Sequence, residues 1–230
     1  MLTRADLIRR ARAKLDDIAL PYLWSDSELI DYINDTIIDA SIRANLTVED
    51  DIAIPFTQTG AVWNAKYAMS SGILDVKSVY LASQPTVPLL RTSMRRQEQL
   101  YQNRPTESGT PWGYALDKTK AGTGDDADIF VRSITFLGTP IEADTAYADV
   151  VRLPAKLETN YDIPEMDPMW HPDLLFGIAG LAYLKRDSDT YDPQRSIKEF
   201  GFFEERFGPR LPASVLRERQ TEVPLEMIVC

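Results

Sequence analysis

Histidine and cysteine are nearly absent from this 230-residue sequence, which has one of each, His171 and Cys230. A single cysteine excludes an internal disulfide. One histidine and one cysteine are also too few for a zinc site, which is usually built from a cluster of these residues. A histidine-dependent nucleophile could use only His171, and this residue stands before Pro172 at a predicted helix entry. We therefore predict no catalytic, cofactor-binding or metal-binding residues.

Long hydrophobic runs are also absent. The longest uncharged apolar stretch is residues 174–184, and these eleven residues fall well short of the ~20 needed to span a bilayer. Residues 1–20 are rich in arginine and contain no unbroken apolar segment of the kind found in secretory signals. We expect a soluble protein without a membrane partner, made and kept in a reducing cytoplasm.

A helical hairpin is predicted at the N-terminus. Thr3 can cap a first helix, which Pro21 would end. Ser25 and Glu28 form a capping box for a second helix, preceded by Trp24 as part of a hydrophobic staple. The apolar positions recur at spacings of three and four, and are Ile8, Ala11, Leu15 and Ile18 in the first helix and Leu29, Ile33, Ile37, Ala40 and Ala44 in the second.

Basic residues are outnumbered, with 25 Lys and Arg against 35 Asp and Glu, which gives a net charge of −10. This excess repels phosphates and disfavours non-specific binding to nucleic acid. Residues 1–20 are nevertheless net basic, whereas residues 21–51 are strongly acidic, with Asp31, Asp35 and Asp39 on the outer face of the second helix. A basic helix beside an acidic one predicts complementary faces, within one subunit or between neighbouring subunits.

A β-rich region follows the hairpin. Ile52, Ile54 and Phe56 alternate with polar or small residues, as in a half-buried strand. Further strands are predicted at 76–81, 129–137 and 147–153, separated by glycine- and proline-rich turns, and residues 92–102 resemble one helical interruption through Met94 and Leu100.

Helical periodicity returns near the C-terminus. Pro172 can occupy the first position of a helix whose stripe is Leu174, Ile178 and Leu181, and in which Gly177 and Gly180 would allow a neighbouring backbone to come close. Asp192 and Pro193 would start the last helix, and Gly208 would end it. The inward residues predicted for this helix are Ile197, Phe200, Phe203 and Phe207.

Together these elements predict an α+β protein. Residues 1–50 and 156–208 would form a discontinuous helical bundle, because neither helix pair can bury its stripe alone. Residues 51–155 would form an inserted, mostly β domain, and residues 209–230 an extended C-terminal tail.

Three motifs have some of the residues of a calcium loop, a phosphate loop or a glycosidase carboxylate pair, but the order or spacing of their residues disfavours each of these sites. Residues 187–192 contain three aspartates but lack the glycine and glutamate of a calcium loop, so we predict a turn capped by Asp192. Residues 118–124 have the composition of a phosphate loop in the wrong order, and we predict a hairpin loop. Adjacent acidic residues such as Asp16 and Asp17 could serve a glycosidase-like pair only if they faced each other.

The C-terminal tail ends in several apolar residues, although no further helix or strand is predicted after Gly208 to bury them. An uncovered apolar segment promotes aggregation, so the tail either packs back on its own domain or extends into a partner or a neighbouring subunit. The residues that would make this contact are Arg217, Arg219, Val223, Leu225, Met227, Ile228 and Val229.

The order of these features resembles one known family. Residues 24–34, with a tryptophan, a polar cap, Glu-Leu and then Ile-Asn, resemble the opening of head-to-tail adaptor proteins of tailed bacteriophages. Residues 109–114 (GTPWGY) and 134–140 (ITFLGTP) are similar to the inserted β region of that family. Ile163-Pro164 and residues 171–175 resemble its return to helix, so the similarity runs through nearly the whole chain as an ordered series.

The resemblance implies a structural protein of the virion and not an enzyme. Such adaptors form a ring, usually of twelve subunits, below the portal, where they extend the DNA channel and connect the capsid to a tail or nozzle protein. DNA would pass through this ring without sequence-specific binding, and the acidic face would line the channel or an intersubunit contact. The tail would dock on the portal. The alternatives are a cell-wall-degrading virion hydrolase with a carboxylate pair and an unrelated helical interaction module.

Overall fold

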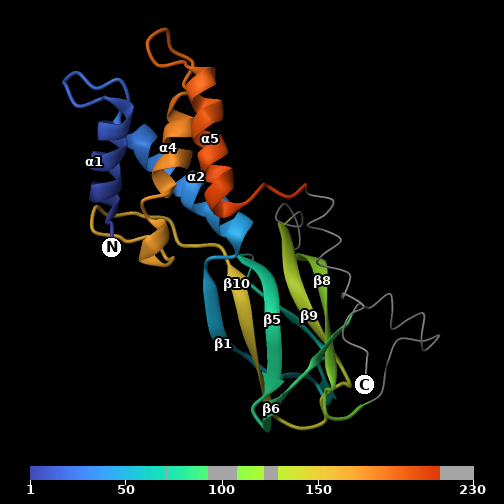
Figure 1. Cartoon of the computed structure of the whole chain (residues 1–230). Helices are drawn as coiled ribbons and strands as arrows, with labels where there is room; N and C mark the ends of the chain where they lie inside the picture. The colour runs from blue at the N-terminus through green and yellow to red at the C-terminus, as the bar shows by residue number, and fades with distance from the viewer. Residues whose placement is uncertain (71, 93–107, 122–128, 213–230) are drawn as a thin grey trace. The chain divides into compact units, whose positions relative to one another are not determined.

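The computed structural model describes residues 1–70, 72–92, 108–121 and 129–212 (Figure 1). Its helices are α1 (Arg4–Leu15), α2 (Asp26–Ala44), the short 3-10 helix η1 (Pro168–Trp170), α4 (Leu174–Ala182) and α5 (Pro193–Phe207). Its strands are β1 (Val48–Pro55), β2 (Gln58–Thr59), β3 (Val62–Trp63), β4 (Lys66–Ala68), β5 (Ile73–Leu81), β6 (Gln84–Pro88), β7 (Leu90–Thr92), β8 (Gly113–Ala121), β9 (Ile129–Leu137) and β10 (Thr145–Arg152). The predicted α+β class is confirmed.

The described chain divides into two compact units. Residues Met1–Thr47 and Leu153–Leu211 contain all the described helices, and we call them the helical unit. The segment between them, Val48–Arg152, contains the strands, and we call it the β unit.

Both helices of the N-terminal hairpin begin with a capping box. The Thr3 hydroxyl accepts a hydrogen bond from the Asp6 N–H at 3.2 Å, and the Asp6 carboxylate accepts one from the Thr3 N–H at 3.3 Å. Ser25 and Glu28 make the same reciprocal pair at the start of α2. Each box provides partners for N–H groups that a helix start otherwise leaves unpaired. The predicted start of each helix is therefore confirmed.

The first helix ends earlier than predicted. α1 stops at Leu15 because Asp16 adopts a left-handed conformation (φ 59°), and Pro21 therefore lies in the loop that follows. Ile18, predicted to extend the buried stripe, lies in this loop with 71% of its surface exposed. The predicted stripe of α2 is buried from Leu29 to Ala40, whereas Ala44 at its end is exposed.

The last helix has the predicted ends but a different inward face. Asp192 caps α5 by accepting the Arg195 N–H at 3.0 Å, and Gly208 ends the helix with a φ of 85°. Ile197 was predicted to point inward, but it is 68% exposed. Ser196 is buried in its place, because its hydroxyl donates to the carbonyl oxygen of Gly180 on α4 at 2.8 Å. The inward stripe of α5 therefore begins with a polar residue whose hydrogen bond joins two helices.

Helix α4 lies at the centre of the helical unit, where it packs against α1, α2 and α5 (Figure 1). It begins at Leu174, slightly later than predicted, because residues 168–170 form η1 with Asp167 as its cap. The predicted close approach at its glycines comes from side chains and not from a backbone. A Cβ atom at Gly177 would lie 2.5 Å from Thr36 Cγ2 and 3.0 Å from Phe203 Cε2.

We expect Gly177→Ala to destabilise the helical unit by about 1–2 kcal/mol. Overpacking a filled core costs about 1–3 kcal/mol, and the higher helix propensity of alanine returns at most about 1 kcal/mol. Urea denaturation followed by circular dichroism at 222 nm measures the change. Gly201→Ala on α5 is the matched control, since nothing lies within 4 Å of its added Cβ, and this variant should be unchanged or more stable. Equal stability of the two variants would contradict the packing argument.

The β unit contains two four-stranded sheets and a small hairpin of β2 and β3 (Figure 1). The first sheet has the order β1-β10-β5-β6 with antiparallel neighbours, and the second has the order β4-β9-β8-β7, in which β7 runs parallel to β8. The sheets share one hydrophobic core, to which Val79 and Val150 contribute from the first sheet and Ile134 and Phe136 from the second.

The strand predictions agree with β5, β9 and β10, and Ile54 and Phe56 are buried as their alternation indicated. Residues 118–124 were predicted to form a hairpin loop, but Lys118 to Ala121 belong to β8 and pair with β9, up to Ala121 opposite Ile129, and residues 122–124 lie outside the described residues. The predicted helix at 92–102 begins at the last residue of β7. Its remaining residues, including Met94 and Leu100, lie outside the described residues.

We expect the β unit to lose stability between about pH 10 and pH 12 through Tyr114. Burial raises the pKa of the Tyr114 hydroxyl to about 12. Because this pKa lies above that of an unfolded tyrosine, the stabilisation is complete below pH 10 and is lost as the pH rises through 12. The loss should reach about 2 kcal/mol at pH 11.5.

Tyr114→Phe tests this expectation, because the variant should lose less stability than the wild type between pH 8 and pH 11.5. The hydroxyl of Tyr80 donates a hydrogen bond to Asp51, which raises the pKa of Tyr80 to about 12 as well. Its contribution is common to both proteins and cancels in the comparison. An identical loss in the two proteins would show that Tyr114 is not responsible.

Candidate functional site

His171, the single histidine, is fully buried and has a structural position. Its Nδ1 accepts a hydrogen bond from the Leu2 N–H at 3.1 Å, and its Nε2 lies 3.2 Å from the carbonyl oxygen of Met166. Nε2 of the neutral ring donates this second bond. Both ring nitrogens are therefore used to hold the start of the chain against the segment that leads into α4.

The acidic motifs have separate structural partners. Asp16 is exposed at the end of α1, whereas the side chain of Asp17 is buried beside Arg12, so the two carboxylates have different surroundings. In the segment 187–192, Asp192 caps α5 as predicted. Within the described part of the chain, no three His, Cys, Asp or Glu side chains are grouped so that they could hold a metal ion, and no helix is long and apolar enough to cross a membrane.

The predicted acidic face of α2 has two exposed carboxylates and one that is used within the unit. Asp31 and Asp35 are exposed. Asp39 is half-buried, and its carboxylate pairs with Arg43 at 2.8 Å. Arg43 also donates to the carbonyl oxygen of Gly208 at 3.0 Å, so this pair helps to hold the end of α5. Asp31 and Asp35 are therefore the members of the face that are presented outward.

The basic residues of α1 also divide into exposed ones and ones that bind within the helical unit. Arg9 and Arg10 are exposed, although Arg9 also makes an exposed ion pair with Asp6 at 3.3 Å. The others bind within the unit: Arg4 donates to the carbonyl oxygens of Leu157 and Glu158, Arg12 pairs with Asp17 and Asp26, and Lys14 pairs with Glu199. Only part of the positive charge predicted for this helix therefore faces outward.

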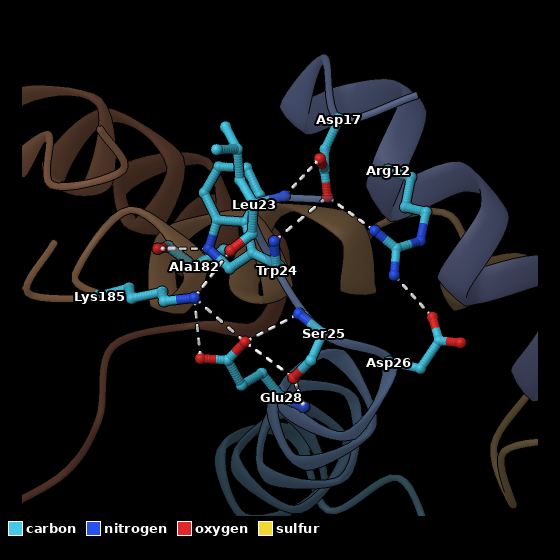
Figure 2. Close-up of polar contacts among 9 residues, drawn as sticks. All are labelled: Arg12, Asp17, Leu23, Trp24, Ser25, Asp26, Glu28, Ala182 and Lys185. Atoms are coloured by element: carbon cyan, nitrogen blue, oxygen red, sulfur yellow. Dashed lines mark hydrogen bonds and ion pairs between the residues drawn. The ribbon is translucent and has the colours of Figure 1, made fainter. Parts of the chain in front are cut away.

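The loop between α1 and α2, residues 16–25, is held by a buried ion pair (Figure 2). Arg12 Nη1 lies 2.6 Å from Asp17 Oδ2, and 9% of the Arg12 side chain and 2% of the Asp17 side chain are exposed. The Asp17 carboxylate also accepts the N–H groups of Leu23 at 2.8 Å and Trp24 at 3.3 Å. One carboxylate therefore fixes both the start and the end of the loop.

The last residues of this loop are tied to the end of α4 (Figure 2). The indole N–H of Trp24 donates to the carbonyl oxygen of Ala182 at 3.0 Å, and Lys185 donates to the carbonyl oxygen of Leu23 at 2.7 Å. Lys185 also pairs with Glu28 at 3.0 Å. The N–H of Ser25, and then Lys185, hold the pKa of Glu28 below its usual range. These contacts hold the end of the loop, and Asp17 with Arg12 holds its start.

The side chains of the loop contrast with its polar anchors. Its four large apolar side chains outside Trp24 are exposed, namely Ile18 (71%), Leu20 (78%), Tyr22 (43%) and Leu23 (43%). Sequence reasoning missed this surface because it assigned Ile18 to the first helix and treated the following residues as a simple turn. The run of apolar residues around Pro21 was the available signal.

The residues predicted to dock on the portal lie outside the described residues. They are Arg217, Arg219, Val223, Leu225, Met227, Ile228 and Val229. The described chain reaches Pro212, shortly after Arg210, whose guanidinium lies 3.8 Å from the Asp39 carboxylate.

Comparison with known protein families gives a match over nearly the whole chain. The family model described as SU10 adaptor protein matches residues 2–226 of the chain. No curated protein matches it. The matched range includes both the helical unit and the β unit, so the similarity extends over the whole architecture and is not limited to one unit.

Proposed function

Because the chain belongs to the SU10 adaptor protein family, and is thus a structural protein of the bacteriophage virion, we propose that it forms a ring below the portal. In this role it connects the capsid to a tail or nozzle protein at the neck of the particle and extends the DNA channel. The family match over residues 2–226 carries the proposal. Twelve subunits is the copy number that we propose, and synthesis takes place in the host cytoplasm before assembly.

The proposed architecture is a discontinuous helical bundle with an inserted β domain and an extended C-terminal tail. Each helix pair supplies one side of the same core, since Leu7 and Ile37 of the first pair lie in one hydrophobic cluster with Ile178 and Phe203 of the second. A bundle built from both ends of the chain places a rigid helical body in the ring. The tail is then the segment that reaches a partner.

Net charge supports the proposed DNA channel. The chain carries a net charge of −10, and a ring multiplies this charge around its axis. A negative wall repels phosphates, so DNA slides through it without being bound. Asp31 and Asp35, the exposed carboxylates of α2, lie on a lumen-facing or an intersubunit surface in this proposal.

We further propose that the C-terminal tail, residues 209–230, docks on the portal through the residues that follow Pro212. This segment has a charged part with Arg217 and Arg219, followed by the apolar residues from Val223 to Val229. Apolar side chains flanked by charge are suited to a groove or to strand addition on a partner.

Truncation after Pro212 tests the docking role. The shortened chain, residues 1–212, keeps the Gly208 end of α5 and the Arg210–Asp39 pair, so it should give the same helical circular dichroism as the full chain. We expect the full chain to co-sediment with portal rings of the same phage and the truncated chain to be lost from them.

A full-length variant with Val223, Leu225 and Met227 replaced by serine is the matched control for chain length. This variant should also fail to co-sediment with portal rings. Normal co-sedimentation of the truncated chain would overturn the docking role. Failure of the full chain to associate with any portal ring, and its absence from virions, would overturn the proposed adaptor function itself.

A further inference from the structure

We propose that the loop of residues 16–25 in one copy docks into an apolar groove on the next copy around the ring. This inference rests on the proposed adaptor function and identifies the two surfaces that join neighbouring subunits. Both surfaces belong to the helical unit.

The loop has a fixed backbone but an apolar exterior. The Arg12–Asp17 pair and the contacts of Lys185 and Trp24 hold its backbone in place. A buried ion pair adds little net stability, because desolvation of the charges offsets their attraction, but it can specify one conformation. Here the specified conformation presents Ile18 and Leu20 to solvent, each more than two-thirds exposed. An ordered apolar surface of this kind is typical of a contact that is completed by a partner.

The groove lies between α2, α4 and α5 and has a volume of about 340 Å³. Its walls are largely apolar, with Ile38 and Ile42 from α2, Leu181 from α4 and Phe200 from α5. Asp35, Asp39 and Arg210 stand in the same lining. Asp39 is balanced by Arg43 and Arg210, so Asp35 supplies the negative charge on the α2 side of the groove. It is therefore suited to apolar side chains that arrive together with positive charge.

A second copy of the chain carries apolar side chains next to positive charge. The exposed Arg9 and Arg10 lie on α1, the helix that leads directly into the apolar loop. Asp31 and Asp35 are exposed on α2, beside and within the groove. Loop and groove thus match in polarity, and the helices that carry them match in charge.

The two surfaces also suit a ring. The loop and the lining of the groove have no residue in common, so one subunit can offer them to two different neighbours, which is what a heterologous contact requires. Each subunit can then insert its loop into one neighbour and bind the loop of the other neighbour in its groove. Such contacts close into a ring when the rotation from one subunit to the next is a whole fraction of a full turn.

Cysteine cross-linking tests this contact directly. Cys230 is the only native cysteine, so a Cys230→Ser background is free of thiols. On this background we place Leu20→Cys in the loop and Ile38→Cys in the groove, and treat portal-bound particles with a short bismaleimide. We expect a ladder of covalent dimers, trimers and larger species on a denaturing gel.

The single-cysteine variants are the matched controls. Neither Leu20→Cys nor Ile38→Cys alone should cross-link, because the loop of one subunit meets the groove of the next and not a second loop or a second groove. Particles assembled from a mixture of the two variants should give dimers only, because each subunit then carries one cysteine. Absence of the ladder from particles that contain the chain would overturn the inference while leaving the adaptor function intact. An adduct of the loop cysteine with a portal or tail protein would also overturn it and would identify that protein as the occupant.

Charge reversal gives a second, independent test. Replacing Arg9 and Arg10 by glutamate should reduce the number of copies retained on portals by at least tenfold, and so should replacing Asp31 and Asp35 by lysine. The chain with all four replacements restores opposite charges across the contact and should recover most of the loss. No recovery in a chain with normal circular dichroism would overturn the pairing of these faces.

Discussion

Replacing Asp17 by alanine should lower the free energy of unfolding of the helical unit by about 3–5 kcal/mol, the cost of breaking a buried ion pair. The substitution leaves the largely buried guanidinium of Arg12 without its buried partner. It also removes the acceptor of the Leu23 and Trp24 N–H groups. Urea denaturation followed at 222 nm measures the loss.

Asp26→Ala is the matched control for Asp17→Ala. Asp26 pairs with the same guanidinium at the same distance, 2.6 Å, but 70% of its side chain is exposed. An exposed pair contributes about 0–1 kcal/mol, so this variant should be close to the wild type. Asp17→Asn keeps a hydrogen-bond acceptor without the charge and should fall between the two. Equal effects of Asp17→Ala and Asp26→Ala would show that burial of the pair does not matter.

Trp24→Ala should be comparably destabilising, by about 3–5 kcal/mol, the range for removing a large buried aromatic side chain. Trp24 is 2% exposed, its indole N–H donates to Ala182, and its ring packs edge-on against Tyr183 at a centroid distance of 6.4 Å. The substitution opens a cavity where the loop, α2 and α4 meet.

Trp24→Phe separates the hydrogen bond from the packing. It keeps an aromatic ring but leaves the Ala182 carbonyl oxygen without this donor, and a loss of about 1–3 kcal/mol is expected. Tyr161→Ala serves as the surface control, because Tyr161 is 87% exposed and such substitutions usually change stability by less than about 0.5 kcal/mol. A loss in Trp24→Ala no larger than in Tyr161→Ala would contradict the anchoring role of Trp24.

Local signals in the sequence were sufficient to predict where α1, α2 and α5 begin. The Thr3 cap, the Ser25–Glu28 box and the Asp192 cap depend on residues within a few positions of one another, so their chemistry can be read without the fold. The family resemblance was also found in the sequence, and the match over residues 2–226 confirms it.

Signals that depend on tertiary contacts were missed. The Arg12–Asp17 pair forms only because Asp16 turns the chain into a left-handed conformation after α1. Ser196 faces inward in place of Ile197 because a carbonyl oxygen of another helix accepts its hydroxyl. The groove is assembled from three helices that are distant in sequence. None of these features has a local periodicity that would predict it.

The β unit begins and ends on two neighbouring strands. Val48 at the start of β1 is paired with Val151 near the end of β10 in an antiparallel register, which places the two Cα atoms about 5 Å apart. A segment whose ends are this close can be replaced by a tight turn without stretching the chain on either side. During evolution, a single recombination event could therefore exchange or delete the whole segment while the reading frame that encodes the helices stays continuous.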